Sequence, residues 1–387
     1  MHRSSTTDHA GMRPLRVRTV RRQNHHFRLG IDLGQQNATF VARTMTLRRL
    51  VGWSQAFAPV PEAGYDLVHS VNAVPIMTRR PYVISFENFL PRVPEDTHIG
   101  WLEHVLQRRL LRDVRSDRCL ALLPMSRYAI RQFRAQNRAF AGREELERRM
   151  RVLYPAIETP GHGPKPHSAG ISLLFVGFNF IGKGGPALLR AHERLRARGL
   201  PVSTTIVSSL QWAEDDFLGP PSRPYVEQEL RRLGGAAITH HRTLPNSQTL
   251  ELMRRVDYLV LPTLHDTFGY VAIEALSRGT PVIATDTCAL PEIVQHGRSG
   301  FLLPFERDEE VGRWRYLYQT GEADYLDRFD QAIELLAQGI VDAVERAWEQ
   351  RRDYEAMSQS ALERARTRFS RAYARAALEQ IYERARA

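Results

Sequence analysis

Apolar and polar positions alternate regularly along the second half of the chain. Short apolar runs typical of buried strands lie at 171–178, 201–207, 236–240 and 258–261. Between them lie stretches with the 3.6-residue period of an amphipathic helix, at 186–198, 225–233 and 247–255. A short helix is also expected at 291–296, and a helical pattern fills 330–387 with a break near Phe369 and Ser370. Strands that alternate with helices at this spacing favour a doubly wound parallel sheet, as in Rossmann-like domains.

The first half of the chain has a weaker pattern. Strands are expected at 27–33, 65–71, 82–86, 119–123 and 151–154, with an amphipathic helix that carries Leu102, Val105, Leu106 and Leu110 on one face. Ser126 is placed to cap a further helix at 127–140. Residues 1–26 show no periodicity and are expected to form a disordered basic arm. We therefore predict a second, less regular Rossmann-like domain.

The segment from Pro160 to Pro166 marks the boundary between these halves. It holds three prolines and two glycines, which can continue neither a helix nor a strand ladder. The sequence therefore predicts an N-terminal domain at 27–160 and a C-terminal domain at 161–365. Two such sheets would face each other across a cleft at the carboxyl ends of their strands.

The stretch from Leu259 to Ile283 carries the clearest chemical signal. An apolar run leads into a turn with Phe268 and Gly269, after which a short helix begins. The unpaired N–H groups and positive dipole end of such a helix favour an anion. Asp266 and Glu274 are eight residues apart, so they lie about two helical turns apart near the same face. Phosphates on the amides and hydroxyls on the carboxylates would suit a diphosphate that carries a polyol.

Composition indicates a globular protein in a reducing compartment. Apolar residues make up 43% and charged residues 25%, and the only cysteines are Cys119 and Cys288. The sequence has no apolar run of transmembrane length. These features favour a cytoplasmic location, and the net charge of +11, concentrated at 1–26 and 101–151, makes an anionic membrane surface at the inner face a candidate partner. A plainly solvated surface explains the charge equally well.

Lysine is rare in this chain, which gives weight to its position. Of the 54 basic residues, only Lys165 and Lys183 are lysines. A coding preference for arginine explains this bias, and no recognition module or interleaved aromatic residues indicate a nucleic-acid partner. Lys183 lies in the glycine-rich turn at 182–185, where its presence suggests that a compact ammonium group is required.

Three glycine-containing motifs in the second half resemble one known family. They are VGFNFIGKGG at 176–185, PTLHDTFGYVAIEALSRGTPVIA at 262–284 and the PEIV segment that continues to residue 303. Together they resemble the retaining glycosyltransferases of family 4, over residues 170–304. The resemblance implies the GT-B fold, two Rossmann-like parallel-sheet domains that face a cleft. It also implies that the helix at 366–387 returns to the first domain.

The resemblance implies a role for each matching position. Lys183 would neutralise the leaving β-phosphate, and Asp266 would meet hydroxyls of the transferred sugar or simply cap the following helix. Glu274 would bind the ribose hydroxyls of the donor. Donor-binding positions would also include the loop from Arg242 to Leu244, which is equally readable as a plain loop, and Gly177 with the amides of Phe268, Gly269, Tyr270 and Val271. No metal and no further cofactor are implied.

Two positions depart from the family pattern. Phe178 replaces the usual diphosphate-binding arginine, which removes one of two cations expected beside the leaving group. Glu87 ends the strand at 82–86 where the family has a histidine-containing motif, so it is either a catalytic substitute or an ordinary polar residue at a strand end. No catalytic base is assigned.

These features favour an enzyme that moves a sugar from a nucleotide-diphosphate sugar to a glycan or lipid-linked acceptor, in synthesis of a surface polysaccharide. The alternatives are a non-catalytic nucleotide-sugar binder, motivated by Phe178, and a GT-B epimerase or phosphorylase. The sequence leaves the donor base, the sugar, the acceptor and the oligomeric state open.

Overall fold

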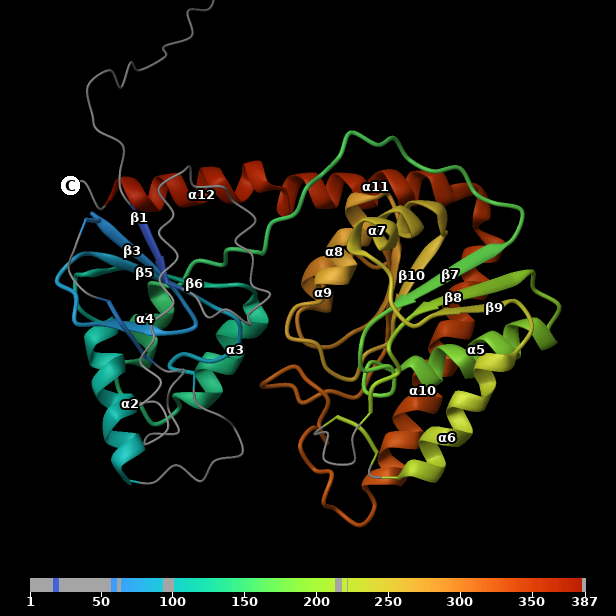
Figure 1. The fold of residues 1–387 in the computed structure, drawn as a ribbon, viewed down its shortest axis with the longest axis horizontal. Helices are drawn as coiled ribbons and strands as arrows, with labels where there is room; N and C mark the ends of the chain where they lie inside the picture. Colours follow the sequence, from blue (N-terminus) through green and yellow to red (C-terminus); the bar gives the residue numbers. More distant parts are fainter. Residues whose placement is uncertain are drawn as a thin grey trace, which may run out of the picture.

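The computed structural model describes residues 17–20, 57–60, 64–92, 101–212, 218–220 and 222–384, and these form two lobes, each built on a parallel sheet (Figure 1). The sheet of the first lobe has the strand order β1-β3-β5-β6. Its strands are Val17–Val20 (β1), Leu67–Val71 (β3), Tyr82–Phe86 (β5) and Cys119–Pro124 (β6). A short parallel pair, Phe57–Pro59 (β2) and Val74–Ile76 (β4), accompanies it.

Alternate residues of these strands point to opposite faces of the sheet, and each face has its own core. On β5, Ile84 and Phe86 pack against the face covered by α2 (Trp101–Val114) and α3 (Arg127–Gln136), near the short helix α4 (Arg143–Arg148). Val83, the residue before Ile84, belongs to the other face, which is covered by α12 (Arg371–Glu383). The last helix of the chain therefore completes the core of the first lobe.

The second lobe holds a six-stranded parallel sheet in the order β12-β11-β10-β7-β8-β9. Its strands are Ile171–Val176 (β7), Val202–Val207 (β8), Ile238–His241 (β9), Tyr258–Leu261 (β10), Val282–Thr285 (β11) and Gly300–Leu303 (β12). Its helices are Gly185–Ala197 (α5), Arg223–Arg231 (α6), Asn246–Arg255 (α7), Tyr270–Ser277 (α8), Leu290–Ile293 (α9), Tyr325–Glu349 (α10) and Tyr354–Arg368 (α11). Helices α5, α6 and α10 pack on one face, and α7, α8, α9 and α11 on the other.

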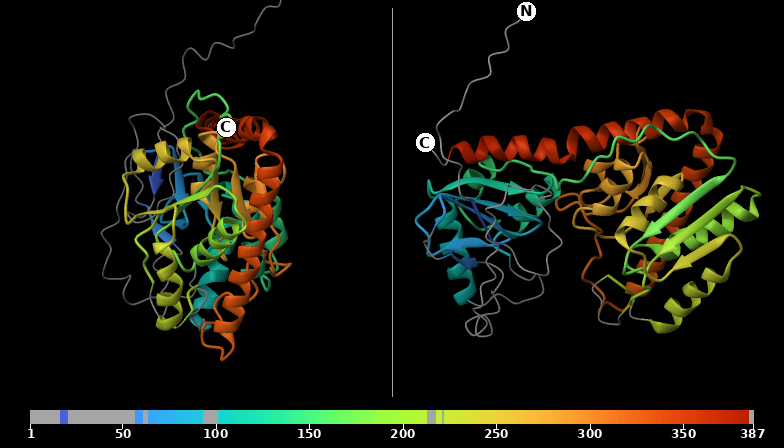
Figure 2. Two further views of the ribbon diagram at one scale, coloured as in Figure 1. Left: turned by 90° about the vertical axis from the view of Figure 1, so that its right-hand side faces the viewer. Right: turned by 45° about the horizontal axis from the view of Figure 1, so that its top comes forward.

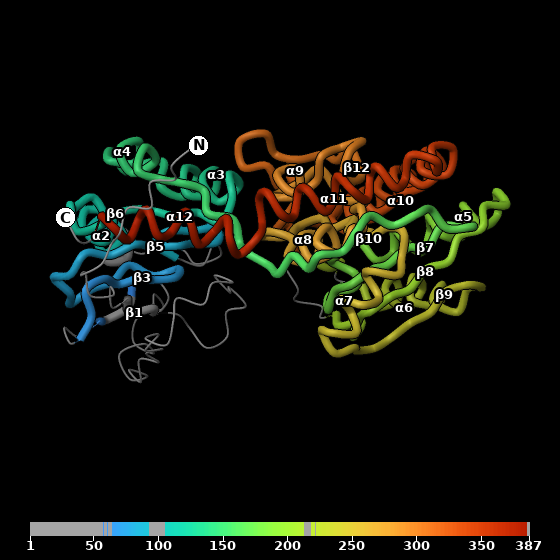
Figure 3. Tube along the Cα trace, turned by 90° about the horizontal axis from the view of Figure 1, so that it is seen from above, coloured from blue at the N-terminus to red at the C-terminus, as the bar shows by residue number. Residues whose placement is uncertain are grey.

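The chain passes between the lobes twice, in two segments that lie side by side (Figures 2 and 3). The first passage is the segment 151–170, which has no helix or named strand. The second is the junction of α11 and α12, where Ser370 caps α12 by accepting from the amide of Tyr373. The passages are joined by backbone hydrogen bonds, from Ile157 N to Phe369 O at 2.8 Å and from Arg371 N to Ile157 O at 3.3 Å.

The pair of parallel sheets confirms the predicted fold class, and most predicted elements of the second half end within two residues of the observed ones. Three helical predictions need correction. The helix expected at 127–140 ends at Gln136, the one at 291–296 is the four-residue helix α9, and 330–387 is interrupted near residue 351 as well as at Phe369. Ser126 caps α3 as predicted, accepting from the amide of Ala129.

Two predictions for the first half are wrong. Residues 151–154 form no strand, although Arg151 and Leu153 donate to β6 carbonyls, because Pro155 ends the extended run before a ladder is complete. Val17–Val20, inside the predicted disordered arm, form β1 through pairing with β3, a non-local partner that periodicity in four residues cannot show. The strand expected at 27–33 lies outside the described residues. Within the described ranges, no helix is long and apolar enough to cross a bilayer.

Candidate functional site

The order of the second sheet reverses direction between β7 and β10, and the loops after these two strands lie next to each other. Gly184, in the loop after β7, has φ of +76°, and a Cβ there would lie 1.8 Å from the carbonyl oxygen of Pro262 in the loop after β10. Only glycine allows that approach. The carboxyl edge of a parallel sheet at such a switch point is the usual ligand-binding position in doubly wound folds.

Lys183 and Asp266 form an ion pair between these two loops. The Nζ atom of Lys183 lies 2.8 Å from Asp266 Oδ2 and also donates to the carbonyl of His265 at 3.0 Å. The other carboxylate oxygen, Oδ1, accepts from the amides of Phe268 at 3.1 Å and Gly269 at 2.8 Å. Burial opposes ionisation of Asp266, but Lys183 outweighs it and holds the pKa of the carboxyl below its usual range. Both amides precede α8, whose N-cap is Gly269 and which has no side-chain cap, so Asp266 holds the turn before the helix and the predicted helix cap is wrong.

The residue before α8 must be a glycine, because a side chain there would clash with a neighbour. Gly269 has φ of +92°, and a Cβ there would press on Leu290 at 2.7 Å. The first turn of α8 leaves backbone N–H groups without helical acceptors, including those of Tyr270 and Val271. Glu274 is partly exposed one turn further on, between the buried residues Ile273 and Ala275. This loop and helix have the features predicted for a phosphate site.

The first lobe meets this turn through the end of β5. Glu87 follows β5 directly, its amide donates to Asn72 Oδ1 at 2.9 Å, and its carboxylate lies 3.3 Å from Arg92. The next residue, Asn88, donates from Nδ2 to the hydroxyl of Thr267 in the second lobe at 3.3 Å. The structure therefore brings Glu87 to the Asp266 turn, from which it is distant in sequence.

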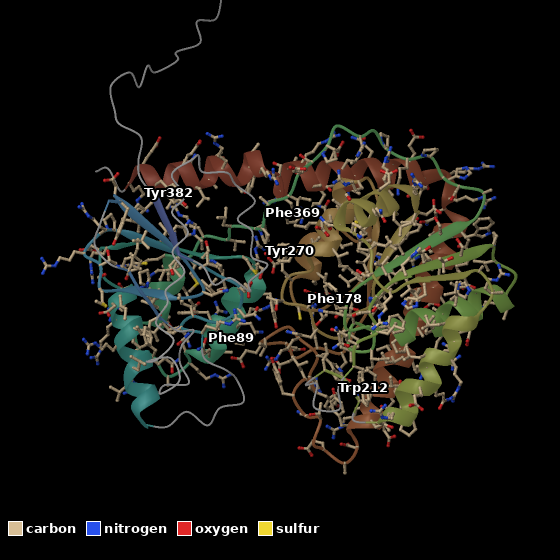
Figure 4. The ribbon with its side chains drawn as sticks, viewed as in Figure 1. Phe89, Phe178, Trp212, Tyr270, Phe369 and Tyr382 are labelled. Atoms are coloured by element: carbon tan, nitrogen blue, oxygen red, sulfur yellow. The ribbon has the colours of Figure 1, made fainter. Side chains whose placement is uncertain are left out.

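Phe178 lies where the family pattern has a positively charged arginine. Its side chain is 73% exposed just after β7 (Figure 4), and its carbonyl accepts from the hydroxyls of Ser208 and Ser209. The neighbouring Gly177 is held by its amide, which donates to Val207 O at 3.0 Å. Because Phe178 is uncharged, this position supplies no cation in place of the expected arginine.

A second positive charge reaches the site from a loop that the sequence analysis did not interpret. Burial and the positive charges of Lys183 and Arg313 lower the pKa of His265 to about 3, although the negative charge of Asp266 acts in the opposite direction. Contacts connect Arg313 to this site, because the adjacent Gly312 carbonyl accepts from Cys288 N at 2.7 Å and Cys288 Sγ lies 3.3 Å from His265 Nδ1. The three motifs end at residue 303, so the sequence analysis had no signal for Arg313.

The remaining predicted residues lie further along the same edge of the sheet. The Arg242–Leu244 loop follows β9, which is two strands away from β7, and Arg242 is exposed while Leu244 is partly buried against the core. No cluster of three or more potential metal ligands occurs among the residues that the structure describes.

Glu292, from the third motif, joins the two lobes. Its carboxylate accepts from the backbone amides of Arg127 at 2.7 Å and Tyr128 at 2.8 Å, at the beginning of α3, and from the hydroxyl of Tyr154 at 3.1 Å. Just beyond the end of α3, Arg138 makes two 2.9 Å contacts with Glu310. Sequence motifs could not reveal this role, because the contacts of Glu292 with α3 span more than 160 positions.

Comparisons with known proteins agree with this geometry. Residues 170–313 match the family described as Glycosyl transferases group 1. A D-inositol 3-phosphate glycosyltransferase from Jonesia denitrificans is 41% identical over 162 residues, which are 40% of this chain and 35% of that protein. A glycogen synthase from Mycobacterium tuberculosis is 31% identical over 145 residues, 38% of this chain and 33% of that protein. The matched segments thus span about a third of each relative.

Solved structures extend the similarity to both lobes. Sucrose-phosphate synthase from Thermosynechococcus elongatus superposes with a TM-score of 0.54 at 15% identity, covering 83% of this chain and 74% of that one. Anabaena HepE in complex with UDP superposes with a TM-score of 0.55 at 17% identity, covering 82% and 79%. The chain therefore has the GT-B fold, and its residues 170–313 match the glycosyl transferases of group 1.

Proposed function

We propose that this protein is a glycosyltransferase that moves a sugar from a nucleotide-diphosphate sugar to a glycan or lipid-linked acceptor, with retention of the anomeric configuration. The observation that carries the proposal is the Lys183–Asp266 pair, held at the switch point between two glycine turns and the beginning of α8. A cation, a carboxylate and free helix amides at one position suit a diphosphate joined to a polyol. The similarity of residues 170–313 to group 1 glycosyl transferases supports the same conclusion.

In the proposed reaction, the bond between the sugar's anomeric carbon and the β-phosphate oxygen breaks while the acceptor oxygen bonds to that carbon. The acceptor's proton passes to an oxygen of the departing diphosphate. Lys183 neutralises the charge that grows on the β-phosphate, which lowers the barrier. Asp266 and Glu274 bind hydroxyls of the sugar and the ribose, respectively, and the Arg242–Leu244 loop contacts the base. Glu87 approaches the reacting sugar from the first lobe.

Arg313 supplies the second cation in this proposal. Phe178 cannot bind an anion, whereas the charge of Arg313 acts on His265, whose carbonyl binds Lys183. We place the product in surface polysaccharide synthesis and the protein in the cytoplasm, at or near the inner membrane face, because arginines of the first lobe would attract an anionic lipid surface.

Calorimetric titration tests the proposal most directly. UDP-, GDP- and ADP-sugars are titrated into the protein, with UDP first because HepE was solved with UDP. We expect one donor class to bind and Glu274→Ala to weaken it about tenfold through loss of ribose contacts. Absence of binding by all three classes contradicts the proposal.

A second candidate function is a nucleotide-sugar binder without transferase activity, favoured by the exposed Phe178 in place of a cation. Donor hydrolysis or sugar transfer above background by the wild-type protein, measured with radiolabelled donors, excludes this candidate. Donor binding with neither activity excludes the enzyme.

A further inference from the structure

The side chain of Tyr270 ends in a buried hydroxyl that the fold does not use. Tyr270 is the first residue of α8 and lies at the edge of the second lobe that faces the first (Figure 4). Among the described residues, no atom makes a hydrogen bond with this hydroxyl, although it is shielded from solvent. A buried polar group without a partner costs free energy, and such groups are rare unless a ligand completes them.

The position of this hydroxyl is fixed by packing. The Tyr270 ring stacks edge-on against Phe268 with a centroid distance of 5.5 Å. Phe268 is fully buried and in turn contacts the rings of Tyr154 and Phe369. The hydroxyl is therefore presented by a rigid aromatic cluster, as a preorganised contact requires.

Two carboxylates, one from each lobe, act electrostatically on the hydroxyl. Burial and then the negative charges of Glu87 and Asp266 raise the pKa of the Tyr270 phenol, so the hydroxyl keeps its proton. Glu87 belongs to the first lobe and Asp266 to the turn before α8, and the Asn88–Thr267 hydrogen bond joins the lobes beside them. The negative charges of these carboxylates disfavour a phosphate beside the phenol, whereas a neutral hydroxyl of a ligand can donate its one proton to a carboxylate and accept from the phenol.

We propose that the Tyr270 hydroxyl and the Glu87 carboxylate together bind a hydroxyl group of the transferred sugar, as a sugar-recognising pair that spans the two lobes. This inference rests on the proposed function and adds a role for the tyrosine side chain beyond its backbone amide. It assigns recognition of the sugar to both lobes, while the diphosphate is bound by the second lobe alone.

The test separates binding of the sugar from binding of the nucleotide. Dissociation constants are measured for UDP-glucose, UDP-N-acetylglucosamine, GDP-mannose and ADP-glucose, and for the bare nucleoside diphosphate of whichever donor binds. For Tyr270→Phe we expect the nucleotide-sugar affinity to fall about 3- to 10-fold, as for one lost hydrogen bond, with affinity for the bare diphosphate unchanged. Because the variant removes only an unpaired hydroxyl, its melting temperature stays at or above that of the wild type.

Two further variants sharpen the result. Glu87→Gln should produce the same selective loss, and the double variant should lose less than the product of the two single effects, because both groups bind one hydroxyl. Tyr225→Phe is the matched control, since it removes a phenol bonded to Asp330 at 2.9 Å on the α6 side and should leave both affinities unchanged.

Equal affinities of wild type and Tyr270→Phe for the sugar nucleotide, or equal losses for sugar nucleotide and bare diphosphate, overturn the inference and leave the proposed function standing. If the wild-type protein binds no sugar nucleotide in the panel, the proposed function itself is contradicted, and the inference with it.

Discussion

At the scale of single residues, both lysines of this arginine-rich chain have specific partners. Lys183 binds Asp266 and the carbonyl of His265. Lys165 is buried, where its Nζ atom donates to Val256 O and to Thr280 Oγ1, and burial lowers its pKa to about 7. A compact ammonium fits sites where a planar guanidinium does not. In this chain a lysine therefore marks a position with specific partners, but its rarity alone does not distinguish a binding site from a structural site.

Asp266 combines a structural role in the turn before α8 with a proposed sugar contact, and two substitutions separate these roles. Asp266→Asn keeps an oxygen that accepts from the amides of Phe268 and Gly269, so we expect stability within about 0.5 kcal/mol of wild type. Asp266→Ala removes both bonds and should cost about 1 kcal/mol or more. Urea denaturation measures the difference.

Both Asp266 substitutions remove the charge beside the sugar, so transfer should fall in both, on the order of 10²-fold. Full transfer activity in Asp266→Asn would leave the residue with its structural role in the turn alone.

Arg313 is expected to contribute positive charge to the diphosphate site. Arg313→Gln should weaken nucleoside diphosphate binding about tenfold, and the loss should shrink at high salt because the interaction is electrostatic. Arg315→Gln is the control, since Arg315 is exposed in the same loop and pairs with Glu306 at 3.3 Å. Equal effects of the two substitutions would assign the loss to the net charge of the loop rather than to a contact by Arg313.

At the scale of elements, the first amides of α3 in the first lobe are bonded to a carboxylate of the second lobe. Glu292 accepts from the amides of Arg127 and Tyr128 at the positive end of the helix dipole. Ser126 accepts from the next amide, so the beginning of α3 is fully capped only when the lobes are together.

Glu292→Ala should therefore lower the free energy of unfolding by about 1–2 kcal/mol and increase the radius of gyration measured by small-angle X-ray scattering. Glu310→Gln, which weakens the exposed pair with Arg138, should change stability by less than about 0.5 kcal/mol. An unchanged radius of gyration for Glu292→Ala would show that the contact does not hold the lobes together.

The elements that sequence predicts best are those with local signals. Strand–helix alternation and glycine turns placed β7 to α9 because period and turn chemistry are encoded within a few residues. Strand β1 and the Glu292 cap depend on partners far along the chain, so no local pattern marks them. The orphan hydroxyl of Tyr270 is likewise invisible in sequence, because Glu87 approaches it only after both lobes fold.

At the scale of the whole molecule, the last helix stabilises the first lobe through a buried histidine. The Nδ1 atom of His69, in β3, lies 2.5 Å from the hydroxyl of Tyr382 in α12. Its Nε2 atom lies 2.7 Å from the hydroxyl of Ser85. Burial lowers the pKa of His69 from 6.5 to about 4. Folding therefore requires the neutral ring, and the contact between the N-terminal and C-terminal parts of the chain depends on pH.

Proton linkage gives the direction in which the free energy of unfolding changes with pH. The unfolded chain binds more protons than the folded one between pH 6.5 and 4, so the contribution of His69 is complete above this range and is lost as pH falls. Between pH 7 and pH 5 this loss amounts to about 2 kcal/mol. Denaturation at both values, in wild type and in His69→Gln, isolates the term from other groups. The same pH dependence in both proteins would contradict it.

The two side-by-side passages between the lobes have a mechanical consequence. Segment 151–170 and the α11–α12 junction are joined by backbone hydrogen bonds at Ile157 and Phe369, so both passages lie along one line between the lobes. Rotation of the lobes about that line could keep the bonds at Ile157 but would separate Glu292 from the amides at the beginning of α3, whereas twisting one lobe against the other would also break the bonds at Ile157. If the proposed function holds, substrate entry and product release would each require the contacts of Glu292 with α3 to open while the passages stay bonded at Ile157.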